Sequence, residues 1–592
     1  MEKYKNISKD LQSLLKCVDR EKAFRHAKWL VENAADRLPS SSGLDRAIEY
    51  VADVMKNYRL NVKIDRFEAY NSLPISARLC ILSPVIKEFP CFPQCHSAST
   101  GPEGVVGSVV YVGAGGVEDY QNVDCRDRIV LTELSYSPPR PEKARIAAIN
   151  GAKAVIIMNW GPSESELLPR GAVKSVWGNP TPSTFYQIPK IPVVGVSRAV
   201  GEYIKQLINS DEEVRVFLVS EVTQHWDILS QPIGVIEAEN SEGIIVVGGH
   251  IDAWSPGATC NAAGNGALLE LSRVFASVQQ CLRRDVIFAF WNGHEIPEAA
   301  GSTWFVDTYW RELRSRGIAY INVDSPGMKG TTTFRALATP EILEFAKNVA
   351  ANVLQTSEYS TEILRGKHSD LSFYGVGVPS IIARSAFDSE SLKQTNNATL
   401  GWWYHSEADT LDKIDIDALY TTLLVNAAYI YFLGTMPVLP FEYETVASNL
   451  YKEIARLAGL CKDEWLGLKQ AEKIANDFVM AAGKVRFVLK DPSIYDREKA
   501  IEINTKLLKL VRILLPITHT TTKRYEQDSY GLSELRHPLP CLSPVIEKIT
   551  EIKNREEQLM LKVEAKRRLN MIIDVLDEAI RTCKDMLEVV KK

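Results

Sequence analysis

Four nearly continuous apolar runs restrict the fold of this chain more than any other feature of its sequence. The runs are GIIVVGGHID at 243–252, DVIFAFWNG at 285–293, GIAYINVD at 317–324 and PSIIARS at 379–385, and stretches with helical periodicity separate them. A strand that is apolar on both of its sides belongs to a sheet that helices cover on both faces, as in parallel α/β sheets. The sequence therefore predicts an α/β/α sandwich over residues 227–440.

Three other segments flank or interrupt this α/β domain. Residues 1–73 have apolar residues at helical spacing and then one alternating strand, so we expect them to complete the α/β domain. Residues 74–226 are short apolar runs separated by Gly and Pro, with one helix expected at 140–150, which predicts a β-rich insert. Residues 441–592 are amphipathic and charge-rich, with one long run at 545–590, and predict a C-terminal helical domain.

Composition excludes several classes of protein. The 592 residues carry a formal net charge of -5, so the chain lacks the basic excess that would favour nucleic acid or an anionic membrane as a partner. The first residues lack the apolar core of a signal peptide and no run of about 18 apolar residues occurs, so we expect a cytoplasmic protein. The ten cysteines show no repeated spacing and are expected to be free thiols.

Residue types that bind metals follow the ends of the predicted strands. His250 ends the first strand, Glu295 follows the second, and Asp324 ends the third. His405 lies in a later loop, GWWYHSEADTLDKID. In an open α/β sheet, ligands bind where the carboxyl ends of the strands meet the loops. One such residue is commonly structural, whereas four in succession favour a metal site.

These residues and their surroundings resemble a known family. GGHIDAW, FAFWNGHE followed by GSTWF, INVD and YHSEADTLDKID are similar to the metal-site segments of the co-catalytic zinc aminopeptidase superfamily, in the branch of glutamate carboxypeptidase and the transferrin receptor. The β-rich insert resembles a protease-associated domain, and MPVLPFEYETVASNLYKEIARL resembles the start of the branch's helical dimerisation domain. The resemblance implies a homodimer formed through the C-terminal helical domain.

The family's site holds two zinc ions, and the resemblance assigns residues of this chain to them. His250 and Asp324 would hold one ion, and Glu295 and His405 the other. Asp252 would orient His250 through its second ring nitrogen. In the family, an aspartate and a hydroxide bridge the two metals, the hydroxide attacks the amide carbonyl, and a second glutamate is the general base.

Two central positions depart from the family pattern. Cys260 stands at the bridging aspartate and His294 at the general-base glutamate. The site loses anionic charge, which favours one metal ion per chain, although a bridging thiolate can still support two. Thiolate is a softer ligand than carboxylate, so we expect Zn2+, with Fe2+ as the alternative. Cys260, Glu295 and His405 would give the three protein ligands of a catalytic zinc, and the opposing interpretation is a neutral buried thiol in a vacated site.

His294 and its neighbours leave alternatives open. An imidazole has an ordinary pKa of about 6.5, which suits a general base near neutral pH; otherwise His294 would be a metal ligand or would hydrogen-bond a substrate carbonyl. Glu298, in a segment one residue longer than the family spacing, would lie near the site. Lys367, His368 and Tyr404 either form a basic and aromatic pocket for an anionic or ring-bearing substrate or only pack their loops.

Three functions are compatible with these features. We favour a metal-dependent hydrolase of amide or peptide bonds, either a peptidase of aminopeptidase or carboxypeptidase type or a small-molecule amidase. The second is a metalloenzyme with non-peptidase chemistry, such as a lyase or cyclase, with His294 as acid or base. The third is an inactive dimeric scaffold. Random loss of function would remove ligands indiscriminately, whereas Cys260 and His294 remain competent in metal binding and proton transfer.

Overall fold

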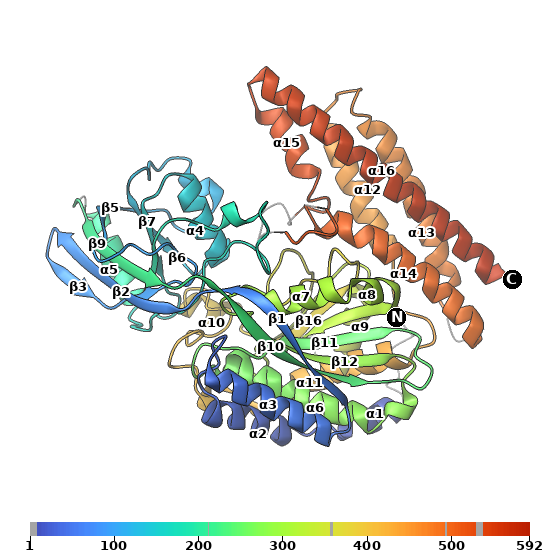
Figure 1. The fold of residues 1–592 in the computed structure, drawn as a ribbon. Coiled ribbons are helices and arrows are strands. Elements are labelled where there is room, and N and C mark those ends of the chain that lie inside the picture. The colour runs from blue at the N-terminus through green and yellow to red at the C-terminus, as the bar shows by residue number, and fades with distance from the viewer. Residues whose placement is uncertain are drawn as a thin grey trace.

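The chain folds into three parts: a helix-covered sheet, a smaller sheet that projects to one side, and a bundle of long helices (Figure 1). This is a computed structural model, and it describes residues 9–210, 212–355, 359–491, 494–521, 523–528 and 537–591.

The largest part is built on an eight-stranded sheet. Its middle strands β12, β11, β13 and β16 are parallel and coincide with the four apolar runs, which confirms the predicted α/β fold class. In sheet order the strands are β1 (Asn61–Asn71), β10 (His225–Ile236), β12 (Asp285–Trp291), β11 (Ile244–His250), β13 (Gly317–Asn322), β16 (Ser380–Ala386), β14 (Thr333–Ala338) and β15 (Tyr359–Ile363).

The register of the parallel strands brings three loops to one edge of the sheet. His250 pairs with Trp291 across β11 and β12, and Gly248 pairs with Asn322 across β11 and β13. The chain therefore leaves these strands at neighbouring positions, and the side chains that follow can meet.

Helices cover both faces of this sheet. In Figure 1, α2, α3, α6 and α11 lie below the sheet, and α7 and α8 lie above it. The side chains of Asp19 and Ser41 cap the starts of α2 and α3, as the helical pattern near the N-terminus predicts. The helices of this part are α1 (Lys9–Lys16), α2 (Arg20–Asn33), α3 (Ser42–Asn57), α6 (Ala263–Ala276), α7 (Ala300–Thr308), α8 (Trp310–Arg316), α9 (Leu343–Leu354), α10 (Ser389–Gln394) and α11 (Ile416–Thr435).

Among the described helices, only α11 is long and apolar enough to cross a membrane, a segment that the search for apolar runs missed. It packs against α2, α6 and α9 and against strand β16, and its buried residues include Leu423, Tyr429 and Leu433. A helix that is apolar on all sides is expected in the core of a large domain. The apolar character of α11 is therefore explained by its place under the sheet.

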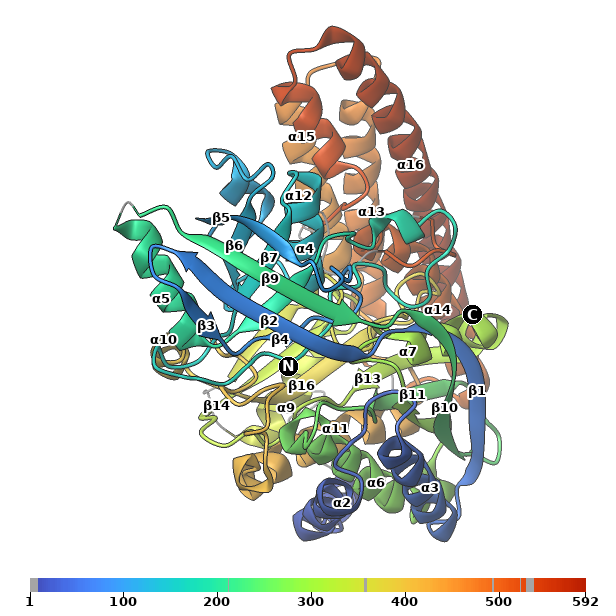
Figure 2. The same ribbon diagram turned by 60° about the vertical axis from the view of Figure 1, so that its left-hand side comes forward.

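The smaller part is a second eight-stranded sheet with two helices. The chain enters it from β1 and returns to the large sheet through β10, and Figure 2 shows these connections side by side. The sequence predicted α4 (Arg140–Ile149) but missed α5 (Arg198–Asn209), which Ser197 caps. In sheet order the strands are β3 (Lys87–Phe89), β2 (Pro74–Ser83), β9 (Arg215–Val222), β5 (Val105–Tyr111), β6 (Ile129–Glu133), β7 (Ala154–Met158), β8 (Val193–Val196) and β4 (Phe92–Pro93).

The C-terminal part is helical, as expected, but its last helix is shorter than predicted. The expected run at 545–590 is divided between α15 and α16, because the Asn554 side chain accepts the N–H groups of Glu556 and Glu557 and starts a new helix. The helices are α12 (Glu444–Leu460), α13 (Leu468–Val488), α14 (Arg497–His519), α15 (Ser543–Glu551) and α16 (Arg555–Lys591).

The close approach of α2 and α6 leads to a first prediction. A Cβ at Gly266 would lie 2.2 Å from the carbonyl oxygen of Ala23, so the two helices would have to separate. We expect Gly266→Ala to lower the stability of the α/β domain by about 1–3 kcal/mol, even though alanine is favoured over glycine inside an isolated helix by about 1 kcal/mol. The measurement is the thermal unfolding midpoint.

Gly459 of α12 supplies the matched control, because a Cβ there would meet nothing within 4 Å. Gly459→Ala should be neutral or slightly stabilising. Equal losses of stability in the two variants would contradict the packing argument.

Candidate metal centre

Amide side chains hold the loop between β11 and α6 in place. Asn261 Nδ2 donates to the carbonyls of His250, at 3.2 Å, and Val323, at 3.3 Å, and Oδ1 accepts the N–H of Ser325 at 3.1 Å. Asn265 Nδ2 donates to the same His250 carbonyl at 3.0 Å. These bonds tie the end of β11 to the end of β13, so the side chains after both strands have fixed positions.

A buried carboxylate fixes Cys260 from the other side of the loop. Asp409 Oδ1 accepts the N–H and the hydroxyl of Thr259, at 2.9 and 2.8 Å, and Oδ2 accepts the N–H of Cys260 at 3.1 Å. Arg37 is fully buried close to Asp409 and donates to the Gly257 carbonyl at 2.8 Å. No sequence pattern singled out either residue, although Asp409 belongs to the motif that contains His405.

Cys260 lies at the centre of the predicted ligands. Its Sγ is 3.5 Å from His250 Nε2, 3.8 Å from Glu295 Oε1 and 3.9 Å from His405 Nε2. On one side, Asp324 Oδ1 is 3.6 Å from His250 Nε2, and on the other, His405 Nε2 is 2.9 Å from Glu295 Oε2. The five side chains therefore form two pairs with the thiol between them. The ligand atoms of His250, Cys260 and Glu295 all lie within 4.8 Å of one another.

Backbone carbonyls orient both histidines. His250 Nδ1 lies 2.8 Å from the carbonyl oxygen of Asp252, and His405 Nδ1 lies 3.1 Å from that of Arg170 in the inserted domain. A carbonyl can only accept, so each Nδ1 carries a proton, and a neutral ring then presents a bare lone pair at Nε2. Both Nε2 atoms face a carboxylate, which also carries only lone pairs when ionised. Acceptors that converge in this way need a shared positive charge, either a proton on Nε2 or a metal ion. A histidine held by its other nitrogen is the usual arrangement around a metal.

The electrostatics favour a positive charge at the same place. Burial and His294 oppose protonation of His250, but the carboxylates of Asp324 and Glu295 outweigh them and raise its pKa. Burial, together with these carboxylates, raises the pKa of the Cys260 thiol well above its usual value. A bound dication would take the place of the histidine proton and stabilise the thiolate. Imidazole, thiolate and carboxylate ligands together fit zinc.

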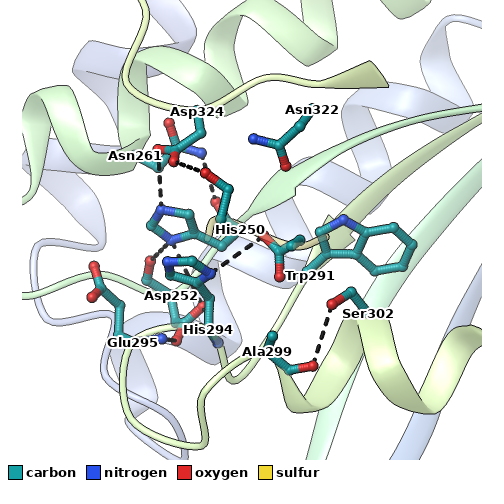
Figure 3. A network of polar contacts seen from close by, with 12 residues as sticks. His250, Asp252, Asn261, Trp291, His294, Glu295, Ala299, Ser302, Asn322 and Asp324 are labelled. Atoms are coloured by element: carbon teal, nitrogen blue, oxygen red, sulfur yellow. Dashed lines mark hydrogen bonds and ion pairs between the residues drawn. The ribbon is translucent and has the colours of Figure 1, made fainter. Parts of the chain in front are cut away.

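Asp252 contacts both His250 and the loop after β12. Its backbone carbonyl, and not its carboxylate, receives the proton of His250, and the carboxylate oxygen lies 3.9 Å from His250 Nδ1. The carboxylate instead accepts the N–H groups of His294, at 3.2 Å, and Glu295, at 2.8 Å (Figure 3). Asp252 therefore orients the loop after β12 as well as the histidine after β11.

His294 lies beside the cluster of ligands. Its ring stacks on His250, with 4.1 Å between the centroids and 15° between the planes (Figure 3). Its Nδ1 lies 3.4 Å from Oδ2 of Asp370, a fully buried residue that no sequence pattern singled out. Burial opposes protonation of His294, but Asp370 and the other nearby carboxylates raise its pKa well above the usual value. This position favours proton transfer over metal ligation for His294.

Glu298 is buried near the site but faces a cation of the inserted domain. Burial raises the pKa of Glu298 to about 8, against the effect of the buried Lys174. Lys174 Nζ donates to the Gly178 carbonyl, and the Gly178 N–H donates to the Glu298 carbonyl at 2.7 Å. The longer segment after Glu295 therefore forms a contact between the two domains.

The three residues predicted to bind substrate have different surroundings. Lys367 is buried, and its Nζ contacts the Gln527 side chain of the helical part. Tyr404 stacks on His405, with 3.6 Å between the centroids and 16° between the planes. His368 is half-buried, and burial lowers its pKa to about 4. These contacts are compatible with either of the two alternatives, a substrate pocket or packing of the loops.

Comparison with known proteins identifies two domains. Residues 233–430 match peptidase family M28, and residues 105–204 match the PA domain. The first range contains all of the predicted ligands, and the second contains the smaller sheet's parallel strands. The chain therefore contains a peptidase family M28 domain into which a PA domain is inserted, and the resemblance drawn from its motifs is confirmed.

The relatives include proteins named as an aminopeptidase, an inactive zinc metalloprotease and a transferrin receptor. Aminopeptidase YwaD of Bacillus subtilis (strain 168) is 24% identical over 409 residues, which are 67% of this chain and 81% of that protein. Inactive zinc metalloprotease C354.09c of Schizosaccharomyces pombe is 29% identical over 245 residues, 38% of this chain and 29% of the relative. Transferrin receptor protein 2 of Homo sapiens is 24% identical over 314 residues, 48% and 37% of the two chains. The chain thus spans about a third of the length of these two relatives.

A solved structure has the same fold. The zinc aminopeptidase BSAP from Bacillus subtilis superposes with a TM-score of 0.54 at 22% sequence identity, over 71% of this chain and 96% of that one.

The contacts of Asp409 lead to a prediction about metal affinity. Asp409→Ala should weaken zinc binding about 10–100-fold, because the N–H groups of Thr259 and Cys260 lose their acceptor and the loop can shift. The measurement is competition with a fluorescent zinc chelator. Asp412→Ala removes an exposed carboxylate from the same loop and should leave the affinity unchanged. Equal affinities in the wild type and Asp409→Ala would show that the site does not depend on this carboxylate.

Proposed function

We propose that this chain is a metal-dependent hydrolase of amide or peptide bonds whose zinc site includes Cys260. The observation that carries the proposal is the convergence of His250 Nε2, Cys260 Sγ and Glu295 within 4.8 Å, with the Nδ1 of His250 held by a backbone carbonyl. Such a set of buried acceptors is costly unless a cation neutralises it. Membership of the M28 domain in a family of peptidases supports hydrolysis as the reaction.

The residues of this chain have separate parts in the proposed reaction. Cys260, between the two pairs of ligands, would bind one ion or bridge two, with Asp324 and His405 as the outer ligands. When bound, zinc supplies a Lewis acid for the amide carbonyl. His294, next to His250, exchanges the proton that the attacking water loses and the leaving amine gains. Zinc is favoured over Fe2+ by the family, and the substrate is a peptide or another small amide.

A scaffold without activity is the competing function, and one relative is named an inactive zinc metalloprotease. The two functions differ in metal content and turnover. We would purify the protein without chelators, measure zinc and iron by elemental mass spectrometry, and assay a panel of aminoacyl p-nitroanilides, dipeptides and N-acyl amino acids. One or two zinc ions per chain together with turnover support the hydrolase. Absence of metal after reconstitution would contradict it.

Two substitutions separate metal binding from proton transfer. Cys260→Ser should reduce zinc per chain and activity together, because the hydroxyl is a far weaker zinc ligand than a thiolate. His294→Ala should keep the metal and lower kcat about 10²–10⁴-fold, because only the acid or base is removed. Zinc content and kcat are measured on the same samples. Unchanged zinc in Cys260→Ser would remove the thiol from the site, and loss of zinc in His294→Ala would make His294 a ligand.

We further propose that the chain forms a homodimer through its helical part. Leu559, Met560, Val563 and Met571 of α16 are between 42% and 61% exposed. Met560 and Val563 are three residues apart, Leu559 and Val563 are four apart, and Val563 and Met571 are eight apart. These spacings place all four side chains on one side of the helix. A row of exposed apolar side chains on one helix face is typical of an interface.

This proposal is tested by the state of association. Met560→Glu combined with Val563→Glu should shift a dimer to a monomer in sedimentation velocity, because the charges would be buried without partners. Ile149→Glu, at an exposed apolar residue of α4 in the inserted domain, is the control and should not change the mass. A dimer that survives the double substitution would place the interface elsewhere.

A further inference from the structure

A buried carboxylate without an obvious structural role lies behind His294. Asp370 is 0% exposed, and neither of its carboxylate oxygens has a hydrogen-bond partner among the described residues. The one ion-pair contact that these residues offer it is His294 Nδ1, at 3.4 Å. An ionised carboxylate in the interior is strongly destabilising when unpaired, so a contact that compensates it is expected to be specific.

The turn that carries Asp370 is itself anchored to the metal centre. Ser369 has a positive φ of 53°, and its hydroxyl donates to Asp324 Oδ2 at 2.6 Å. The Ser372 N–H donates to the Asp370 carbonyl at 2.9 Å, and the Ser372 hydroxyl accepts from Trp177 Nε1 at the same distance. The turn thus places the Ser369 hydroxyl on Asp324, a candidate ligand, and the Asp370 carboxylate beside His294 Nδ1.

The ring of His294 is held on two sides. Its face lies on His250 (Figure 3), and Nδ1 at its edge lies 3.4 Å from Oδ2 of Asp370. The contact at 3.4 Å is longer than an ordinary N–H···O hydrogen bond. Contacts of catalytic groups are commonly long without substrate and shorten in the reacting complex. A histidine fixed through one nitrogen has its other nitrogen available for a defined direction of proton transfer.

We propose that Asp370 is a positioning residue that holds a proton on Nδ1 of His294 and directs Nε2 toward the substrate side of the site. His294 and Asp370 together replace the single glutamate that the family uses as a base. A carboxylate base needs no such partner, because either oxygen can take the proton. An imidazole base needs such a partner, because its two nitrogens are distinct. In the tautomer that carries its proton on Nε2, this nitrogen cannot accept a proton from water.

The proton balance of the pair is simple. Nε2 of His294 takes a proton from the attacking water as the new C–O bond forms, and the ring becomes an imidazolium whose charge Asp370 stabilises. The same proton passes from Nε2 to the leaving nitrogen as the C–N bond breaks. Asp370 keeps its negative charge throughout, and no oxidant or other reactant is needed.

The expected effect of Asp370 on kcat rests on the proposed function, whereas its expected effect on the protonation of His294 Nδ1 does not. The structural test is the tautomer of His294, observed by long-range ¹H–¹⁵N spectra of protein labelled in its nine histidine rings. His294→Ala identifies the signal. In the wild type we expect Nδ1 to be protonated, and in Asp370→Ala we expect that protonation to be lost or to become partial. A bare Nδ1 in the wild type, or an unchanged Nδ1 in the variant, would overturn the inference.

The kinetic test uses Asp370→Asn, with the p-nitroanilide that the wild type hydrolyses fastest as the probe. We expect kcat to fall about 10²–10⁴-fold, with KM changed less than about threefold and zinc per chain unchanged. Asp370→Glu keeps the charge and should restore part of the kcat. The combination Asp370→Asn with His294→Ala should be no slower than His294→Ala alone, because the two residues act as one unit.

Asp285→Asn is the matched control, since Asp285 is a partly buried aspartate at the opposite end of β12 that pairs with Arg316. It should lower stability without lowering kcat. If Asp370→Asn and Asp285→Asn have the same kcat, the inference is overturned, but the proposed hydrolase function is not. If no substrate of the panel is hydrolysed but the tautomer depends on Asp370, the proposed function fails and the positioning role stands.

Discussion

The convergence of electron-rich atoms at the end of the central sheet governs the organisation of this protein. Two backbone carbonyls, of Asp252 and Arg170, accept the Nδ1 protons of His250 and His405, so the Nε2 atoms of both rings face carboxylates across the Cys260 thiol. Buried acceptors repel one another unless a cation lies between them. The loops, the inserted domain and the N-terminal helices can be understood as the parts that keep this arrangement assembled.

Each of those parts contributes through a different contact. The PA domain contributes the Arg170 carbonyl behind His405, and the N-terminal segment contributes Arg37, buried close to Asp409. Asp409 in turn holds the N–H of Cys260. Of the two residues that depart from the family pattern, His294 has a side-chain partner in Asp370, whereas Asp409 accepts only the backbone N–H of Cys260, which any residue at this position would offer.

The sequence largely predicted which segments form strands and which form helices, but it predicted the ends of these elements less well. The four apolar runs predicted the parallel strands because their burial on both faces leaves no polar alternation. The helix α5 was missed because its amphipathic pattern is short and lies among strands, and the run at 545–590 was not divided because Asn554 also fits a helix interior. The apolar helix α11 escaped notice because scattered polar residues interrupt it, while tertiary packing buries it.

The sequence alone determined which residue types follow the strands, and hence the predicted ligands and the two departures at Cys260 and His294. Motifs carry this information because a strand end and its loop are local in the chain. Only the tertiary structure decided which groups from distant segments contact each of these side chains. Asp370 and Asp409 are distant in sequence from the groups they contact, and the choice between the carboxylate and the carbonyl of Asp252 depends on how the loop turns. Those relations arise when separate segments pack together, so no spacing in the sequence records them.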